Sequence, residues 1–400
     1  MSFKISNVLE YDNFIALDIG ASKVKVAICK IEWWEVKMLA KTSLRQNKKD
    51  FIFGEIADLN SSTKSIEKAI TKACQNIEKI PKDIVVGFSS SQELYDNIST
   101  NYVRQSKEKP ISMEEIDEII KTVEYKSLDK IKTKIESRLG IIDSEMKLIT
   151  TSIISIYIDW QRISNPIWFT GKNVKLNLIN VFAPTGKFNI IKKIINWLGK
   201  NLISIIPIWI TIPKLIEDTP FAFDYNLFVD FGYSKTTIVL ENNSEILGFN
   251  IINFGIEVLE EEFKRKESLN YFDIENIIKE TDVNYSKYEE IFSSFFNLIF
   301  DAIAVASQDI EKALFIKNIF ISWGAVSEVL KEKIWEYFTQ KNFWKNILVK
   351  DKYIEDKNMS ELNNNSDIIL ASIVKVWKEM LSAKKDPIAR ILRYILYKYE

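Results

Sequence analysis

The stretch FIALDIGASKVKVAICKIEWWEVKMLA, residues 14–40, decides the fold, because the same unit recurs as LFVDFGYSKTTIVLENNSEILGF at residues 227–249. Each copy begins with an apolar strand, passes through Asp-x-Gly-x-Ser-Lys and continues as two strands joined by a short polar turn. In the first copy, alternate apolar residues after the turn have the period of a half-buried strand. The repeat predicts two related α/β domains.

The turn of each copy has the composition of an anion-binding loop. Gly20 and Gly232 permit backbone conformations closed to other residues, so that neighbouring N–H groups can point at one anion. Asp18 and Asp230 stand at the heads of the turns, where a carboxylate can hold the hydrated Mg²⁺ that accompanies a nucleotide. A single turn of this kind is equally typical of a simple glycine-bearing hairpin. Two matching turns predict a pair of domains that clamp a polyphosphate between them.

Composition excludes several classes of function. The 54 basic and 55 acidic residues leave no net field that would attract nucleic acid, so we expect no nucleic-acid partner. The absence of histidine excludes Ser-His-Asp and Cys-His nucleophiles and histidine zinc sites, and leaves metal binding to carboxylates. No signal peptide and no apolar run of about 18 residues is visible, which predicts a cytoplasmic body with two buried, reduced cysteines.

Between the two copies the pattern predicts an inserted subdomain. A helix over Ser61–Ile80 and a strand over Asp83–Phe88 complete the first unit. Residues 92–161 then read as a polar loop, a helix from Ser112 with Glu115 as a capping box, and a strand over Lys147–Ile158. The predicted division is 1–91 and 162–207 for the first domain, 92–161 for the insertion, 208–240 and 316–383 for the second domain, 241–315 for a small second subdomain, and 384–400 for a terminal helix.

A third candidate ligand-binding segment lies late in the chain. The strand over Asn318–Ile321 opens onto Ser322-Trp323-Gly324-Ala325 before a helix over Val326–Phe338, which is a usual geometry for the approach of a nucleotide.

The last residues predict a short amphipathic helix that starts at Asp386-Pro387. Its apolar stripe is Ile388, Ile391, Leu392, Ile395, Leu396 and Tyr399, and Arg390, Arg393 and Lys398 lie off the stripe. One interpretation is a helix docked on its own core. The other is a helix that lies on the membrane surface, attracted by anionic lipid. The position at the extreme terminus favours the second.

These segments resemble the actin-like ATPases and, within them, the cell-division FtsA family. LDIGASKVKVAI and VDFGYSKTTIVL resemble the two phosphate motifs, IFISWGAVSEV resembles the adenosine motif, and YIDWQRISNPIWFTGKNVKLNLINV resembles the FtsA segment that returns from the insertion. The resemblance covers nearly the whole chain. It implies two RNase H-like domains around an ATP cleft, with an FtsA-type inserted subdomain.

By this resemblance the ligands are ATP and Mg²⁺, held by both turns and the adenosine motif. The implied nucleotide-binding residues are Asp18, Gly20, Ala21, Ser22, Lys23, Asp230, Gly232, Tyr233, Ser234, Lys235, Thr236, Gly255, Ser322, Trp323, Gly324 and Ala325, and the implied metal residues are Asp18 and Asp230, through water. The implied partners are the FtsZ C-terminal tail, further copies in a filament, and anionic lipid at the division site on the cytoplasmic membrane face. ATP would be mainly an assembly ligand, with at most weak hydrolysis.

Two other functions remain open. A PilM-like pilus-assembly protein has a similar insertion without the lipid-binding tail. A sugar or acid kinase of the same superfold needs a catalytic carboxylate, for which Asp159 is the only candidate. The chain also departs from the FtsA pattern: Tyr233, Ser234 and Thr237 replace expected glycines and an aspartate, and the small second subdomain is shortened.

Tryptophan stands where glycine is expected. The chain has only 11 glycines among 400 residues, against a usual ~7%, but 10 tryptophans. Trp33-Trp34 occupy a two-residue turn that needs positive φ, Trp168 follows Asn165-Pro166-Ile167, and Trp323 stands in a Gly-Gly motif. We hypothesise that Trp33, Trp34, Trp168 and Trp323 are UGA codons that the organism reads as glycine, with Trp160 and Trp209 as further candidates. UGG codons at Trp33, Trp34 and Trp323 would end the hypothesis.

Overall fold

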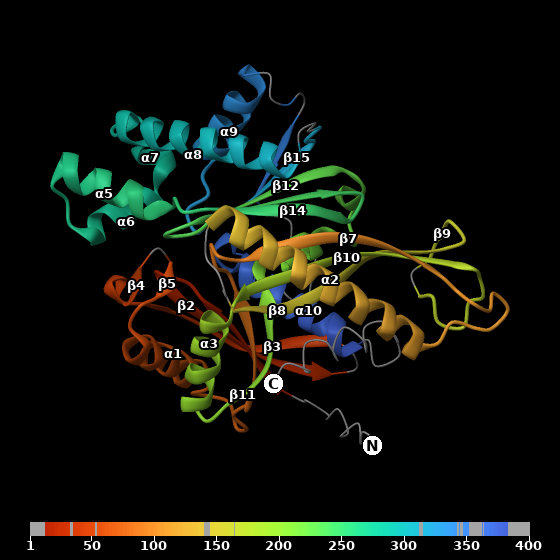
Figure 1. Ribbon diagram of the computed structural model, residues 1–400. Helices are drawn as coiled ribbons and strands as arrows, with labels where there is room; N and C mark the ends of the chain where they lie inside the picture. Colours follow the sequence, from red (N-terminus) through yellow and green to blue (C-terminus); the bar gives the residue numbers. More distant parts are fainter. Residues whose placement is uncertain are drawn as a thin grey trace.

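The computed structural model describes residues 13–32, 35–52, 54–139, 145–163, 165–311, 315–341, 344, 347–351, 362 and 364–382. Figure 1 shows two sheets in opposite halves of the molecule, with a third, four-stranded sheet extending to one side. The predicted terminal helix, with its membrane residues, and the Trp33-Trp34 turn lie outside the described residues.

The first sheet is built from the first copy of the repeat. Its strand order is β11-β6-β1-β2-β3, with β1 at Asn13–Ile19, β2 at Lys23–Glu32, β3 at Glu35–Arg45, β6 at Asp83–Phe88 and β11 at Asn201–Pro207. The first three strands form an antiparallel meander, and β6 and β11 add in parallel. Helices α1 (Leu59–Ala73) and α3 (Thr185–Trp197) bury their apolar faces on one side of this sheet.

Helix α1 ends earlier than predicted. Its first turn is capped by Asp58, which accepts a hydrogen bond from the Ser61 N–H at 2.9 Å. Its last residue is Ala73, and not Ile80, and Cys74 forms the C-cap. The apolar spacing of the sequence continues past this point, but the chain there turns towards Pro81 and the start of β6.

The second sheet repeats the first. Its order is β14-β13-β12-β15-β16, with β12 at Tyr225–Phe231, β13 at Thr236–Asn242, β14 at Glu245–Ile252, β15 at Asn318–Ser322 and β16 at Leu348–Lys350. The turn between β13 and β14 has positive φ at Asn243 and Ser244. Helices α8 (Glu289–Ile310) and α9 (Glu328–Gln340) share its core.

Residues 256–284 form a small helical subdomain beside this sheet, made of α5 (Ile256–Glu267), α6 (Tyr271–Lys279) and α7 (Thr281–Asn284). Within the described part of the chain, α8 is the one helix long and apolar enough to cross a membrane, and 56% of its most apolar window is buried inside the protein. Ten of its residues are buried and nine of these belong to the second core, so it serves here as a core helix.

The insertion is larger than predicted. Its sheet has the order β7-β10-β8-β9, with β7 at Leu94–Val103, β8 at Met146–Ile158, β9 at Gln161–Arg162 and β10 at Asn173–Pro184, and it packs against α2 (Met113–Leu139). The predicted polar loop after Gln92 is therefore wrong where β7 forms. Strand β10 pairs with β7 and β8 along its length, so the insertion sheet continues beyond residue 161. Glu115 completes no capping box: its backbone N–H bonds to Ser112 Oγ, but its carboxylate pairs with Arg104 at 2.7 Å.

Helix α10 (Ile368–Ser382) joins the two halves. It packs on β1 and β6 of the first sheet, and its residues share one hydrophobic cluster with Phe228 of β12 and Phe320 of β15. Trp377 meets Phe14 edge to face, with ring centroids 6.3 Å apart. The core of the protein is thus continuous from one sheet to the other through this helix.

Two of the tryptophans proposed to be glycines have the left-handed backbone conformation that favours glycine. Trp160 and Trp168 have φ of 75° and 73°, and their side chains are 76% and 79% exposed. Left-handed backbone is costly for any residue with a Cβ. Trp209 is different, because it is fully buried, stacks on Phe249 at 3.9 Å and donates from Nε1 to Glu93 at 2.8 Å. Trp209 is a well-packed core residue, which removes the reason to count it as a glycine.

Replacing Trp168 by glycine is expected to stabilise the protein. Trp168→Gly removes the left-handed strain and little buried area, so the free energy of unfolding should rise by about 0.5–1 kcal/mol. The matched control is Trp197→Gly, which removes another exposed tryptophan from the end of α3. This change should lower the free energy of unfolding by about 0.5–1 kcal/mol, because glycine is a poor helix former. Urea denaturation measures both. Equal losses in the two variants would contradict a glycine position at residue 168.

Candidate functional site

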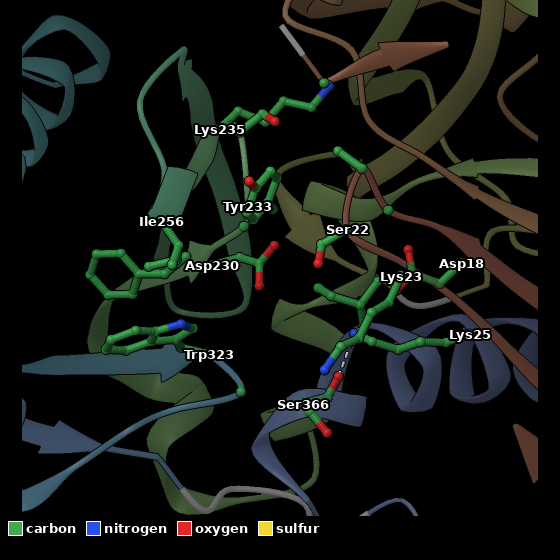
Figure 2. A pocket seen from close by; sticks show the side chains of 18 of the residues that line it. Asp18, Ser22, Lys23, Lys25, Asp230, Tyr233, Lys235, Ile256, Trp323 and Ser366 are labelled. Carbon is green, nitrogen blue, oxygen red and sulfur yellow. Dashed lines mark hydrogen bonds and ion pairs between the residues drawn. The ribbon is translucent and has the colours of Figure 1, made fainter. Parts of the chain in front are cut away.

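The two glycine turns face one cavity of about 330 Å³. Thirteen of the 16 predicted nucleotide-binding residues line it, including Asp18 from β1 and Asp230 from β12. Figure 2 shows these two aspartates on opposite walls, each from its own half of the molecule. The repeat therefore places equivalent residues of the two copies around a shared space.

The first turn is held in shape by hydrogen bonds to its own carbonyls. The Gly20 N–H donates to the Lys23 carbonyl at 3.0 Å, and a Cβ on Gly20 would lie 3.0 Å from that same oxygen. Gln46, at the end of β3, donates from its backbone N–H to Ser22 O at 2.8 Å and from its side-chain amide to Gly20 O at 2.6 Å. Sequence reasoning missed Gln46, because nothing in a single residue after a strand indicates that it ties down a turn.

The second turn is packed against the start of α5. The N–H groups of Ile256 and Glu257 donate to the carbonyls of Gly232 and Tyr233, at 3.2 and 2.8 Å. A Cβ on Gly255 would lie 2.4 Å from Tyr233 O, so only glycine fits there. Gly255 does not line the cavity. Its part is to let the helix approach the turn.

The two aspartates have different surroundings. Asp18 pairs with Lys25 at 3.4 Å, whereas Asp230 accepts a hydrogen bond from the Ser322 hydroxyl at 2.7 Å. Burial raises the pKa of Asp230 to about 6, against the opposing effect of Ser322. A desolvated carboxylate of this kind is stabilised by a cation. Within the described residues no group of three or more Asp, Glu, Cys or His side chains forms a metal cluster.

The cavity walls carry more positive than negative charge. The lining residues include six cations, Lys23, Lys25, Arg45, Lys48, Lys235 and Lys279, and four anions, Asp18, Asp230, Glu260 and Glu275. Burial lowers the pKa of Lys23, and the nearby charges of Lys279, Lys25 and Arg45 lower it further. A bound polyanion would offset the mutual repulsion of these crowded, partly buried cations. Only Lys23 and Lys235 were predicted, since the other cations come from segments without a motif.

The third predicted segment forms another part of the cavity wall. Trp323, Gly324 and Ala325 follow β15 and line the cavity with Ser366. Trp323 is 7% exposed and its ring is tilted against Phe231, with centroids 6.1 Å apart. The indole of Trp323 forms part of the cavity wall.

Two predicted residues support the site from behind. Thr236 and Ser322 do not line the cavity. Thr236 is buried in β13, where its hydroxyl donates to Phe254 O at 2.8 Å, and Ser322 donates to Asp230. The hydroxyls of both predicted residues are thus engaged by neighbouring groups behind the cavity wall.

Asp159 lies far from this chemistry. It sits in the β8–β9 turn of the insertion with φ of 44°, and its carboxylate accepts hydrogen bonds from the backbone N–H groups of Lys172 and Asn173. It is absent from the cavity lining. The kinase alternative thereby loses its one candidate base.

A buried carboxylate next to the cleft makes stability depend on pH. Glu93 accepts hydrogen bonds from Ser90 N–H and Trp209 Nε1, and burial raises its pKa from 4.5 to about 8. The pKa of Glu93 is higher in the folded protein than in the unfolded chain. The contribution of protonated Glu93 to the free energy of unfolding is therefore complete below the unfolded pKa and is lost as the pH rises through the folded pKa. Between about pH 6 and pH 9, the melting temperature of Glu93→Gln should therefore fall less than that of the wild type. If the melting temperatures of Glu93→Gln and the wild type fall equally with pH, the raised pKa of Glu93 is contradicted.

The fold is similar to those of several solved structures. No protein-family model and no curated protein matches the sequence. A solved PilM-PilN type IV pilus biogenesis complex contains a chain with a TM-score of 0.62 at 13% identity, covering 91% of this chain and 98% of that one. A diol dehydratase-reactivating factor, in its nucleotide-free form, gives a TM-score of 0.52 at 7% identity, covering 92% and 100%. This chain has the actin-like ATPase fold. Identities this low show the fold and leave the ligand and the role to be argued from the site.

Proposed function

We propose that this protein binds ATP with Mg²⁺ in the cleft between its two sheets. The observation that carries the proposal is the pair of matching Asp-x-Gly-x-Ser-Lys turns on one cation-rich cavity. Asp18 and Asp230 would hold the hydrated metal, the turn N–H groups and lysines would hold the phosphates, and residues 323–325 would lie against the base. The metal supplies the charge that lets two carboxylates and a polyphosphate share one cavity.

At the level of the cell, we propose an FtsA-like role. The protein would polymerise on the cytoplasmic face of the membrane and attach there through the amphipathic segment at residues 384–400. It would tether the FtsZ ring by binding the C-terminal tail of FtsZ. This rests on the sequence resemblance and on the apolar stripe with its basic flank. ATP would act mainly as a ligand that favours assembly, with at most weak hydrolysis.

A PilM-like role in type IV pilus assembly is the second candidate. The observation in its favour is the likeness to the PilM-PilN complex along 98% of the matched chain. In that complex PilM is bound to PilN. The two candidates differ in the partner and in whether the terminal segment binds lipid.

Vesicle pelleting tests the membrane part of the proposal. The full chain should sediment with vesicles that contain anionic lipid, and a chain that ends at Leu381 should stay in the supernatant. The double variant Ile391→Asp, Leu392→Asp should behave like the truncated chain, because charges on the stripe prevent its insertion. Equal sedimentation of all three would remove the tether.

Peptide binding separates the two roles. The proposal expects a peptide from the C-terminal tail of the organism's FtsZ to bind the purified full chain in a fluorescence anisotropy titration. Binding of a cytoplasmic PilN segment alone would favour pilus assembly instead.

A further inference from the structure

One lysine of the first half is enclosed by side chains of the second half. Lys48 lies in the short helix η1 (Lys48–Asp50) after β3, and its ammonium forms an ion pair with Glu260 of α5. The Lys48 Nζ lies 4.7 Å from the ring centroid of Tyr233 and 4.1 Å from that of Tyr271. The Tyr233 hydroxyl donates to Glu260 at 2.9 Å. These three residues form a cage of one carboxylate and two aromatic faces around the cation.

A second lysine makes the reciprocal contact. Lys235, on the second turn, donates to the Ser89 carbonyl at 2.8 Å and lies 3.4 Å from the carboxylate of Glu55, both in the first half. Figure 2 shows Lys235 extended away from Tyr233 along the cavity wall. Lys48 and Lys235 therefore make contacts in opposite directions, each from its own half to acceptors on the other.

The cage has the chemistry of a strong cation site. A partly buried ammonium gains from a charge-assisted hydrogen bond and from aromatic faces within about 6 Å. Lys48 and Lys235 both line the cavity, together with Tyr233, Tyr271 and Glu260. Because the two lysines come from opposite halves, the halves cannot separate around the cavity until both contacts break.

We propose that Lys48 and its cage of Tyr233, Tyr271 and Glu260 form a clasp that keeps the cleft closed and sets the rate at which nucleotide leaves. The proposal rests on the proposed ATP site and adds its regulation. It also accounts for Tyr233, which stands where the resemblance expects a glycine in the second phosphate motif: its ring and hydroxyl build the cage, which a glycine cannot do.

Release of a fluorescent ATP analogue from the full chain tests the clasp. Lys48→Met keeps the apolar stem and removes the charge, so the dissociation rate measured by stopped flow with excess unlabelled ATP should rise about tenfold, with little change in the association rate. Glu260→Gln should act in the same direction. The matched control is Lys49→Ala, an exposed neighbour outside the cage, which should release the analogue at the wild-type rate. Equal rates in Lys48→Met and the wild type would overturn the clasp.

A second measurement needs no nucleotide. Spin labels on cysteines introduced at Lys68 of α1 and Glu261 of α5 report the separation of the two halves, and the two native cysteines are buried. In the ligand-free full chain, Lys48→Met should lengthen or broaden the measured distance distribution, and Lys49→Ala should not. If the wild type binds no ATP analogue, the ATP proposal fails and the distance distribution alone decides the clasp; an unchanged distribution in Lys48→Met would refute it.

Discussion

A chain that carries both Asp18→Asn and Asp230→Asn is expected to lose ATP affinity on the order of 100-fold in the presence of Mg²⁺, because each buried carboxylate contributes a charge-assisted contact to the hydrated metal. In EDTA the wild type and the double variant should bind ATP with similar weak affinity, since the asparagines keep the shape of the turns. Isothermal titration calorimetry with and without Mg²⁺ measures both. Asp309→Asn, an exposed change on α8, is the control.

The loss should not come from unfolding. Burial raises the pKa of Asp230 to about 6, so at neutral pH its ionised form is a cost to the ligand-free fold. For an acid whose folded pKa lies above its unfolded value, stability falls as the pH rises through the folded pKa. A neutral asparagine removes that cost, and Asp230→Asn alone should melt at or above the wild-type temperature at pH 7.5. Affinity that is unchanged in Mg²⁺ would refute the metal role of the two aspartates.

Trp323→Gly is expected to bind ATP about tenfold more tightly than the chain with tryptophan, since it removes an indole from the wall of the cavity where a base would lie. The same change should enlarge the rise in melting temperature that ATP produces. If residue 323 is a recoded glycine, the Trp323→Gly chain is the natural protein.

Trp209→Gly is the matched control, because it removes another buried tryptophan from the core beside the cavity. It should cost about 3–5 kcal/mol of unfolding free energy and bring no gain in affinity. A fall in ATP affinity for Trp323→Gly would mean that the indole stacks on the base and belongs to the site.

The two repeated units were predictable from sequence because local rules govern them. A fully apolar strand, a glycine turn and a strand of period two fold the same way wherever they occur, and β1 to β3 and β12 to β14 follow that pattern. The insertion was harder. Strand β7 has polar residues on its exposed face, and this composition predicts a loop. Strand β10 lies after the predicted boundary of the insertion, and only its pairing with β7 and β8 shows that it belongs to the insertion sheet.

The sequence by itself determined the two turns, their aspartates and lysines, and hence the kind of ligand to expect, because spacing within a short segment controls where their backbone groups point. Only the tertiary structure decided which distant residues complete the cavity: Gln46 on Gly20, Lys48 in its cage, Lys235 on Ser89, and α10 between the sheets. These contacts join residues far apart in the chain. They depend on how two separately folded halves pack, and no local periodicity records that packing.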